Sequence, residues 1–498
     1  MNANLYALLA AHFADCMDQP CLMVQDGPVV HYEDLAQESA RMANALAASG
    51  CRPGDRVAAQ TEKHWQALAL YLACLRGGFI YLPLNTGYVR GELSFFFEDA
   101  DPRVIVCRPE DENVIAGIAH GASVLTLGAD GGSLVDRSRD AATTFETVTS
   151  GPGDAAAILY TSGTTGRSKG AILSHRNLAS NALTLVDEWG FTRGDVLLHA
   201  LPIYHVHGLF VATHCVLLSG SRMIWLPKFD AAAVAALLPR STVMMGIPTF
   251  YTRLLQEPSF KREACRNVRL FISGSAPLRA EVFDAFRART GQAILERYGM
   301  TETGMLTSNP MNGMRLAGTV GRPLSGVSLR IVDDRGEACA PGAVGCIEVK
   351  GSNVFSGYWR MPEKTREDFS ADGYFKTGDM ASWTAERYVR IVGRAKDLII
   401  SGGLNVYPRE IEDRVNAIDG VVESAVFGVP DSDLGEAVVA VVVPRSNHAL
   451  TETRVISILK NDIANFKVPK RVYFVDHLPR NAMGKVQKNV LRERFGKS

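Results

Sequence analysis

The sequence predicts an α/β fold: a large N-terminal domain of parallel-sheet α/β subdomains, a β-rich subdomain, and a small C-terminal α/β domain. Three observations predict it. Short apolar runs alternate with helical patterns through residues 32–273, which is typical of a parallel sheet. Gly and Pro become dense near residue 317, where hairpin-like strands begin. Helix and strand patterns resume after residue 397.

The elements of the first region follow in order. Residues 32–49 repeat apolar side chains at helical spacing, and Gly50 stands where the helix would end. A strand at 56–60, a helix at 64–75 and an apolar strand at 79–85 come next. Further buried strands are predicted at 104–107, 154–160, 196–200, 223–226, 243–246 and 270–273.

The last two regions differ from the first. The segments VSLRIVD, GCIEVKG and YVRIVG predict a β-rich subdomain built from hairpins. Beyond GRAKD at 393–397, the segment PREIEDRVNAIDG places Ile411, Val415 and Ile418 on one helical face. VVESAVFGV and AVVAVVV then predict strands, so the last hundred or so residues form a separate small domain.

Composition and charge exclude several classes of protein. The chain has 498 residues, of which 47% are hydrophobic and 21% charged, as is usual for a globular protein. Basic and acidic residues both number 53, so the chain lacks the basic excess of a nucleic-acid binder. Its apolar stretches are shorter than the roughly 18 residues that span a bilayer. No membrane span is expected.

The termini and the cysteines predict a cytoplasmic protein. No basic residue precedes the short apolar patch at the N-terminus, so no secretory signal is expected. The final residues, RFGKS, form neither a peroxisomal signal nor a prenylation site. Nine cysteines are scattered without a CxxC spacing, which favours neither a zinc site nor a disulfide framework.

The most specific motif is TSGTTGRSKG at residues 161–170, directly after a predicted strand. Glycines allow backbone N–H groups to turn inward, and hydroxyls add further donors. This composition predicts a loop that surrounds a polyanion. It is not a Walker-type loop, because no GK[ST] follows at the required spacing. The alternative is an ordinary polar turn between a strand and a helix.

Four more motifs follow in order: RYGMTET at 297–303, YFKTGDMA at 374–381, IVGRAKDLIISGGLNVYPREIE at 391–412 and LPRNAMGKVQK at 478–488. With the loop, they resemble the acyl-adenylate-forming (ANL) superfamily of acyl-CoA synthetases, peptide-synthetase adenylation domains and firefly-type luciferases. The resemblance covers about residues 30–490. It implies the ANL fold, with an AMP-binding domain at 1–394, a hinge at 395–397 and a mobile lid domain at 398–498.

The resemblance also implies roles for individual residues. The catalytic residues would be Lys169, Thr301, Glu302 and Lys485, with Glu302 holding Mg²⁺. The nucleotide-binding residues would be Thr161, Ser162, Gly163, Thr164, Thr165, Gly166, Lys169, Ser273, Gly274, Glu296, Arg297, Tyr298, Thr301, Asp379 and Arg394. CoA would pass Ser401, Gly402 and Gly403, and Lys396 would be the hinge residue.

The implied chemistry needs residues of these types. A carboxylate is a weak electrophile, so ATP first converts it into an acyl-adenylate and pyrophosphate, and the thiol of CoA then displaces AMP. Two anions meet in the first step, so cations and N–H donors must surround the α-phosphate. Mg²⁺, Lys169 and Lys485 would supply this charge. One small domain cannot present Lys485 and a thiol tunnel to the same carbon at once, which implies rotation about residue 396.

The acid is indicated by GIPTFYTRLL, FISGSAPL and LERYGMTETGMLTSNP, which look most like malonyl-CoA synthetases. The expected substrates are malonate, ATP and CoA, with methylmalonate or another short-chain carboxylic acid as the alternative. The unreacted carboxylate needs a cation or several donors. Arg253 is the first choice, with Arg279 and Arg315 as alternatives. A surface or structural ion pair is the other interpretation of Arg253.

The predicted substrate-binding residues are His205, His207, Arg253, Ser275 and Met305, and Val206 would bound the pocket with Met305. The HxH spacing lacks a third metal ligand, which favours packing in the acyl pocket. The segment LPIYHVHG has no Asp for an ammonium group, and only 13 residues follow Lys485, so no fused carrier domain is expected. A non-catalytic ATP-binding regulator and a luciferase-like oxidative enzyme stay open as alternatives.

Overall fold

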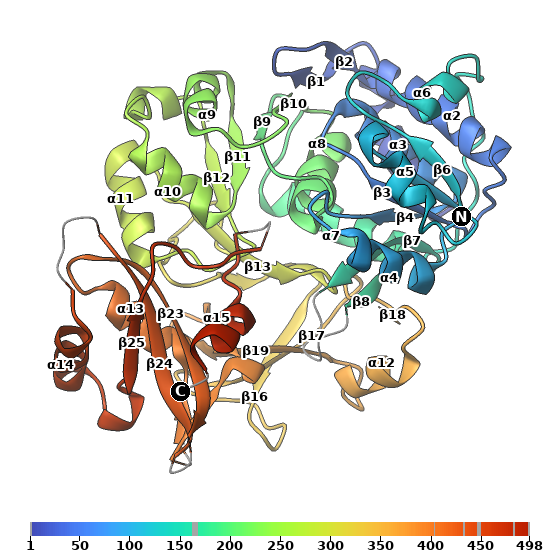
Figure 1. Ribbon diagram of the computed structural model, residues 1–498. Coiled ribbons are helices and arrows are strands. Elements are labelled where there is room, and N and C mark those ends of the chain that lie inside the picture. The colour runs from blue at the N-terminus through green and yellow to red at the C-terminus, as the bar shows by residue number, and fades with distance from the viewer. Residues whose placement is uncertain are drawn as a thin grey trace. The chain divides into compact units, whose positions relative to one another are not determined.

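The computed structural model describes residues 2–161, 168–402, 404–431, 434–445, 450–481 and 484–496, which fold into two compact units (Figure 1). Unit 1 comprises Met1–Ala317, Gly321–Ser328 and Lys350–Gly373. Unit 2 comprises Gly318–Val320, Leu329–Val349 and Tyr374–Ser498. The chain therefore enters unit 2 more than once before its C-terminal part.

One sheet of unit 1 has the strand order β15-β14-β13-β12-β11-β9-β10-β1-β2. Its strands from β13 to β1 run parallel, whereas β14, β15 and β2 are antiparallel to their neighbours. In chain order they are β1 (Pro20–Val24), β2 (Val29–His31), β9 (Val196–His199), β10 (Arg222–Trp225), β11 (Val243–Gly246), β12 (Leu270–Ser273), β13 (Leu295–Met300), β14 (Gly304–Ser308) and β15 (Arg322–Pro323). Three helices lie together beside β11 and β12 in Figure 1: α9 (Ala231–Leu237), α10 (Pro248–Gln256) and α11 (Ala280–Thr290).

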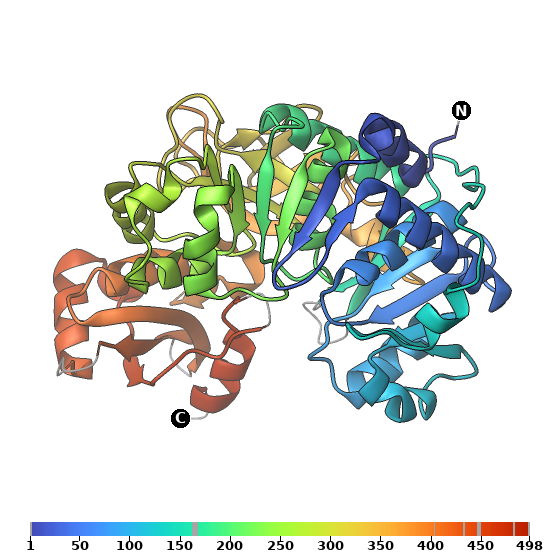
Figure 2. The same cartoon turned by 90° about the horizontal axis from the view of Figure 1, so that it is seen from above.

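The other sheet of unit 1 has the order β18-β8-β7-β4-β3-β5-β6. Its strands are β3 (Arg56–Gln60), β4 (Ile80–Pro83), β5 (Val104–Cys107), β6 (Ser123–Thr126), β7 (Ala155–Thr161), β8 (Lys169–Ser174) and β18 (Gly357–Tyr358). The strands from β7 to β6 are parallel, whereas β8 is antiparallel to both β7 and β18. Figure 2 shows blue helices on both faces of the blue strands.

Helices of unit 1 form where the sequence pattern favours them. In α2 (Tyr32–Ala48), Leu35, Met42 and Leu46 are buried, and Gly50 after the helix has a φ of 89°, which favours glycine. In α3 (Trp65–Gly77), buried residues lie all round the helix, as its apolar sequence requires. The remaining helices are α1 (Leu5–Phe13), α4 (Arg90–Ala100), α5 (Glu112–Ala116), α6 (Ser133–Ser138), α7 (His175–Glu188), α8 (Thr213–Ser219) and α12 (Pro362–Asp368).

Unit 2 has two sheets of its own. One has the order β16-β17-β19-β20, formed by β16 (Ser328–Val332), β17 (Gly345–Lys350), β19 (Phe375–Trp383) and β20 (Val389–Arg394). The other contains β21 (Ile399–Ser401), β22 (Leu404–Val406), β23 (Val421–Asp431), β24 (Gly435–Pro444) and β25 (Arg471–Phe474). Its core joins Ile411 of α13 (Pro408–Asn416), Leu459 of α14 (Glu452–Asp462) and Val442, and α15 (Lys488–Phe495) follows β25.

The predicted fold class is confirmed: parallel α/β sheets, a β-rich sheet and a small α/β part are all present. One local interpretation is wrong at its boundaries. The predicted loop 161–170 is strand at both ends: Thr161 ends β7, Lys169 and Gly170 begin β8, and β8 pairs back onto β7. The predicted hinge, 395–397, is a short 3₁₀ helix inside unit 2, and rotation about it stays a prediction. Among the described residues, none of the helices has the length and apolarity needed to cross a bilayer.

Candidate active site

The hairpin of β13 and β14 carries the predicted magnesium ligand of unit 1. Glu302 lies in the connection between these strands and is 5% exposed. Its Oε1 accepts hydrogen bonds from the Tyr358 hydroxyl at 3.2 Å and from Thr161 Oγ1 at 3.3 Å. Because β18 pairs with β8 and β8 with β7, the sheet brings Tyr358 and Thr161 to one carboxylate.

Two residues that flank the predicted phosphate loop face each other. Thr161 and Lys169 are paired in the β7–β8 ladder, while Ser162, Gly163, Thr164, Thr165 and Gly166 lie outside the described residues. Lys169 is buried, with its Nζ 3.6 Å from Asp368 Oδ2 and 4.2 Å from the centroid of the Tyr358 ring. The ammonium of Lys169 is thus held beside the aromatic ring whose hydroxyl contacts Glu302.

A second group of polar side chains comes from β9, β12 and β13 of one sheet, in which β11 lies between β12 and β9. His205 and His207 follow β9, Ser273 ends β12 and precedes Gly274 and Ser275, and Arg297 lies in β13. In open α/β sheets, ligands bind at the carboxyl ends of the strands. His207 begins a π-helical turn over His207–Ala212, a feature that is frequent at functional sites.

Arg297 is the charged centre of this group. It is 3% exposed, and its Nε and Nη2 lack a hydrogen-bond partner among the described residues. No carboxylate among those residues pairs with it, and burial lowers its pKa to about 9. The guanidinium lies over Gly274, because a Cβ at residue 274 would stand 2.3 Å from Arg297 Cζ. The sequence therefore places a glycine where the cation needs room.

Neutral imidazoles surround this cation. The ring of His207 lies 3.3 Å from Ser275 Oγ through its Nδ1, and His205 Nδ1 accepts a hydrogen bond from the His207 backbone N–H at 3.2 Å. Burial, together with the charge of Arg297, lowers the pKa of His205 to about 4 and that of His207 well below its usual value. His207 Nε2 and Ser273 Oγ are buried without a partner among the described residues. Such a set of unpaired donors is suited to an anion.

The other residues predicted for unit 1 have different surroundings. Glu296 Oε2 accepts a hydrogen bond from the Leu278 backbone N–H at 2.9 Å, and Met305 and Val206 are buried. Tyr298 and Thr301 are half-buried beside the Glu302 turn. Their contacts with nucleotide or acid stay predictions.

The three arginines predicted for the distal carboxylate differ from Arg297. Arg253 is exposed on α10, whose buried face is formed by Phe250, Tyr251 and Leu254. Arg279 lies 3.7 Å from a carboxylate oxygen of Glu281. Arg315 donates hydrogen bonds to the backbone carbonyls of Pro310, Met311 and Ala293. Arg297 differs from these three in that its charge acts on both His205 and His207.

Unit 2 gathers its own charged residues. Asp379 is 4% exposed, and its Oδ1 lies 2.7 Å from Arg394 Nε. Lys485 is close enough to feel these charges: desolvation, then Arg394, lowers its pKa to about 8, with Asp379 acting in the opposite direction. Lys396 adds to the lowering of that pKa. The predicted ribose-binding, phosphate-binding and catalytic residues of unit 2 therefore form one electrostatic cluster.

The predicted CoA-binding residues lie where β21 turns into β22. Ser401 ends β21 and is buried, and Gly402 follows with a φ of 58°. The Gly402 N–H donates to the carbonyl of Leu434 at 2.8 Å. Gly403 lies outside the described residues. The tight turn needs a glycine at 402, and its contact with CoA stays a prediction.

Sequence reasoning missed several residues that hold this site. Tyr358 and Asp368 contact Glu302 and Lys169, and the amides of Asn181 and Asn353 bind the backbone beside Glu302. None lies in a motif, and only the pairing of β18 with β8 would have indicated Tyr358. No group of three or more His, Cys, Asp or Glu that could hold a metal occurs in the described part of the chain.

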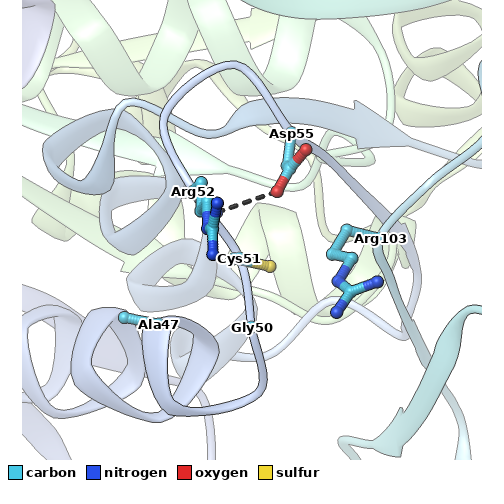
Figure 3. Close-up of a pocket in the computed structure, with 6 residues that line it drawn as sticks. All are labelled: Ala47, Gly50, Cys51, Arg52, Asp55 and Arg103. Carbon is cyan, nitrogen blue, oxygen red and sulfur yellow. Dashed lines mark hydrogen bonds between the residues drawn. The ribbon is translucent and has the colours of Figure 1, made fainter.

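A separate cavity of about 490 Å³ is lined by Ala47, Gly50, Cys51, Arg52, Asp55 and Arg103 (Figure 3). Asp55 Oδ2 accepts a hydrogen bond from the Arg52 backbone N–H at 2.8 Å. The cavity lies at the amino ends of β3 and β5, opposite to the carboxyl ends where ligands bind in such sheets. It contains none of the predicted site residues.

Comparison with known proteins gives the family. Residues 9–359 match the AMP-binding enzyme family, and residues 410–485 match the AMP-binding enzyme C-terminal domain. The chain belongs to the AMP-binding enzyme family. This confirms the resemblance on which the nucleotide-site predictions depend, and with it the ANL fold.

The chain is similar to three proteins of known function or structure. The crystal structure of ATP-bound MatB from Rhodopseudomonas palustris is 55% identical, with a TM-score of 0.98 over 100% of this chain and 99% of that one. A mitochondrial malonate–CoA ligase of Mus musculus is 35% identical, covering 92% of this chain and 84% of its own. A feruloyl-CoA synthase of Amycolatopsis is also 35% identical, covering 94% of this chain and 95% of its own.

Proposed function

We propose that this protein is an AMP-forming acyl-CoA ligase that joins malonate to CoA through malonyl-AMP. The observation that carries the choice of acid is Arg297, a buried guanidinium without a carboxylate partner among the described residues. The similarity to malonate–CoA ligases supports the same acid. Malonate suits the site because its second carboxylate can supply the missing negative charge.

The reaction consists of two displacements. In the first, an oxygen of one malonate carboxylate attacks the α-phosphorus of ATP, and pyrophosphate leaves. In the second, the sulfur of CoA attacks the acyl carbon of malonyl-AMP, its proton is lost, and AMP leaves. The products are malonyl-CoA, AMP and pyrophosphate. Cleavage of the phosphoanhydride bond of ATP drives the reaction, and the CoA thiol ends in the thioester.

Unit 1 would contribute a fixed set of groups to the first displacement. Glu302 would hold Mg²⁺, since carboxylate oxygens are the ligands that this ion prefers, and Mg²⁺ neutralises charge on the phosphates. The hydroxyls of Tyr358 and Thr161 keep the Glu302 carboxylate in place. Lys169 adds a buried positive charge at the end of the phosphate loop. Preorganised charge of this kind is often the largest contribution to catalysis.

Unit 2 would contribute groups that act on the nucleotide. Asp379 is proposed to accept hydrogen bonds from the ribose hydroxyls, and Arg394, paired with it at 2.7 Å, to reach ribose and phosphate. Lys485 would bring its charge to the α-phosphate in the first displacement only. Rotation at Lys396 would then remove Lys485 and let CoA approach along Ser401 and Gly402.

The second carboxylate of malonate would pair with Arg297, a role that differs from the nucleotide binding that the family resemblance implied for this residue. A buried charge without a partner costs free energy, and an anion that reaches it recovers part of that cost. The charge of Arg297 acts on His207, and Ser275 Oγ lies 3.3 Å from Nδ1 of that ring, so both side chains can donate to the same carboxylate. The two histidines are neutral, so the site holds one buried positive charge for one additional negative charge.

Replacing Arg297 tests the proposal. Arg297→Met should lower the malonate kcat/KM about a hundredfold or more, because one partner of a buried charge pair is lost. The kcat/KM for butyrate should change much less, and methylmalonate should follow malonate. The readout is the ratio of malonate to butyrate kcat/KM, which cancels general damage to the enzyme. Arg297→Lys should recover part of it, because the charge stays and the planar fork is lost.

Arg253→Met is the matched control, because it removes the same group from an exposed position of α10. Its malonate to butyrate ratio should equal that of the wild type. The opposite pattern, in which only Arg253→Met lowers the ratio, would move the distal carboxylate to Arg253. A wild-type preference for butyrate over malonate would refute the dicarboxylate assignment altogether.

We also infer that the protein acts in the cytoplasm. Its nine cysteines are all free thiols, and seven of them are buried, which is typical of a reducing compartment. Relatives of the chain include mitochondrial enzymes, so cell fractionation with a compartment marker is the deciding measurement. Recovery of the protein with a membrane-enclosed fraction would contradict the inference.

A further inference from the structure

We propose that Asn181 is a positioning residue for adenylate formation: through the backbone of Met305 it sets the place of the Glu302 carboxylate. The inference rests on the proposed reaction, in which Glu302 holds Mg²⁺. It concerns a side chain in the middle of α7 that lies in none of the sequence motifs and contacts the backbone of Met305. Its evidence is a set of hydrogen bonds around the turn that joins β13 to β14.

Asn181 binds Met305, a residue of β14 directly after this turn, through both atoms of its amide. Its Oδ1 accepts a hydrogen bond from the Met305 N–H at 3.0 Å, and its Nδ2 donates to the Met305 carbonyl at 2.9 Å. The side chain thus acts like a neighbouring strand. Gly304 allows the approach, because a Cβ at that residue would stand 2.6 Å from Asn181 Oδ1, and its φ of 58° favours glycine.

The turn needs this support because its own ladder is irregular. The pairing of β13 with β14 shifts register between Tyr298 and Gly299, and the ladder ends with Met300 opposite Gly304. Residues 301–303 lie beyond that pairing, and Glu302 is among them. Within the hairpin, the Thr303 N–H donates to the Met300 carbonyl at 3.2 Å, and further contacts that hold Glu302 come from outside it.

A neighbouring segment supplies the remaining contacts. Asn353 Nδ2 donates to the Thr303 carbonyl at 2.7 Å, and the Phe355 N–H donates to the Glu302 carbonyl at 2.8 Å. The same helix holds this segment: Asn177 Nδ2 donates to the carbonyls of Ser352 at 2.8 Å and Val354 at 2.7 Å. Both supports of the Glu302 turn therefore depend on α7.

The start of α7 connects these contacts to the phosphate loop. Ser174 ends β8 and caps the helix, since its Oγ accepts a hydrogen bond from the Asn177 N–H at 3.2 Å. Strand β8 begins at Lys169, within the segment 161–170 predicted as the phosphate loop. Helix α7 thus joins strand β8, which carries Lys169, to the turn that carries Glu302, two residues that would act on the same phosphates.

The test replaces Asn181 with leucine, which keeps the size of the side chain and removes both hydrogen bonds. The loss of both hydrogen bonds loosens the turn, so adenylation, measured as pyrophosphate exchange, should fall about tenfold or more. The Mg²⁺ concentration for half-maximal rate should rise by a similar factor. Thiolysis of supplied malonyl-AMP should fall less than about threefold, because that step does not use Glu302.

A second readout needs neither metal nor substrate. In the ligand-free enzyme, the backbone amides of residues 301–305 should exchange with deuterium about tenfold faster in Asn181→Leu, since the opening free energy of the turn is lower. Asn181→Asp keeps the acceptor for the Met305 N–H and should give intermediate values. If the leucine variant does not fold, the aspartate variant provides the test in its place.

Asn44→Leu is the matched control. Asn44 Nδ2 donates to the carbonyls of Ala40, Ala142 and Thr144, so its loss also removes an amide that binds backbone. The control should lower Tm and leave the Mg²⁺ requirement and the exchange at 301–305 unchanged. If Asn181→Leu behaves like this control, Asn181 is only structural. A wild-type enzyme that is inactive with malonate would refute the proposed function and leave the exchange result to decide on Asn181.

Discussion

The guanidinium of Arg297 lies over the Cα of Gly274, with no space for a side chain between them. A Cβ at residue 274 would stand 2.3 Å from both Cζ and Nη1 of Arg297. No real Cβ tolerates such contacts, so a larger residue at 274 would displace the cation. This relationship links the GSAP segment after β12 to the charge in β13.

Gly274→Ala should therefore change specificity more than stability. The atoms that must move are the end of a flexible side chain, so the free energy of unfolding should fall by about 1–2 kcal/mol, a modest overpacking cost. The displaced guanidinium should lower the malonate to butyrate ratio of kcat/KM about tenfold or more. Steady-state kinetics with both acids, together with urea unfolding, measures the two effects.

Gly153→Ala is the control for this variant, because a Cβ at Gly153 would meet no atom within 4 Å. It should alter neither the specificity ratio nor, beyond about 0.5 kcal/mol, the stability. If Gly274→Ala folds normally and keeps the wild-type ratio of malonate to butyrate kcat/KM, the guanidinium does not bind the distal carboxylate.

Lys485 predicts how the first step depends on pH. Desolvation and the charge of Arg394 lower its pKa to about 8 in the free enzyme, and only the protonated amine can neutralise a phosphate. The kcat/KM for ATP should accordingly fall above about pH 8, approaching tenfold per pH unit. Lys485→Arg should abolish this decrease of kcat/KM at high pH, because a guanidinium stays charged. If kcat/KM still decreases above pH 8 in the arginine variant, a group other than Lys485 is responsible for the decrease.

The two half-reactions should separate when the lid is altered. Lys485→Ala should abolish adenylate formation and leave thiolysis of supplied malonyl-AMP largely intact, since its charge is needed only where two anions converge. Lys396→Pro should do the reverse, because a fixed φ in the 3₁₀ turn Ala395–Asp397 hinders rotation and not the first step. Equal loss of both half-reactions in either variant would contradict the two-conformation account.

Local pattern predicted the fold well and the acid site less well. The helix at 32–49 and the strands at 104–107, 243–246 and 270–273 appear where periodicity placed them, because these elements follow from local burial. On α10, the buried residues Phe250, Tyr251 and Leu254 recur at i, i+1 and i+4. Arg253 lies off that face, so the same periodicity would have indicated its exposure.

The contacts that hold the site could not be read from sequence. Arg297 meets Gly274 across two parallel strands, and Tyr358 reaches Glu302 only because β18 pairs with β8. The bond from Asn181 to Met305 likewise joins a helix to a distant turn. Motifs report residues that touch ligands, whereas these contacts depend on tertiary packing, for which a single sequence carries no local signal.

The burial of Lys63 leads us to expect that the stability of the protein depends on pH. Its Nζ lies 2.8 Å from both Nδ1 and the carbonyl oxygen of His199, and 4.3 Å from the centroid of the Trp225 ring. His199 Nε2 lies 3.0 Å from the Gly208 carbonyl, so Nε2 carries the proton and Nδ1 accepts from the amine. Burial holds the pKa of Lys63 well below 10.5.

The sign of the effect follows from the proton count. Between the folded pKa and 10.5, the unfolded chain binds a proton that the folded protein does not, so the free energy of unfolding rises with pH. Lys63→Met keeps an unbranched side chain against Trp225 and has no such proton. The wild-type stability, relative to this variant, should rise with pH from the folded pKa of Lys63 up to 10.5, by up to about 1.4 kcal/mol per unit. Urea unfolding of both proteins at four pH values measures this difference, in which the other titrating groups cancel. Parallel stability curves would mean that Lys63 keeps its charge in the folded protein, with His199 as its acceptor throughout.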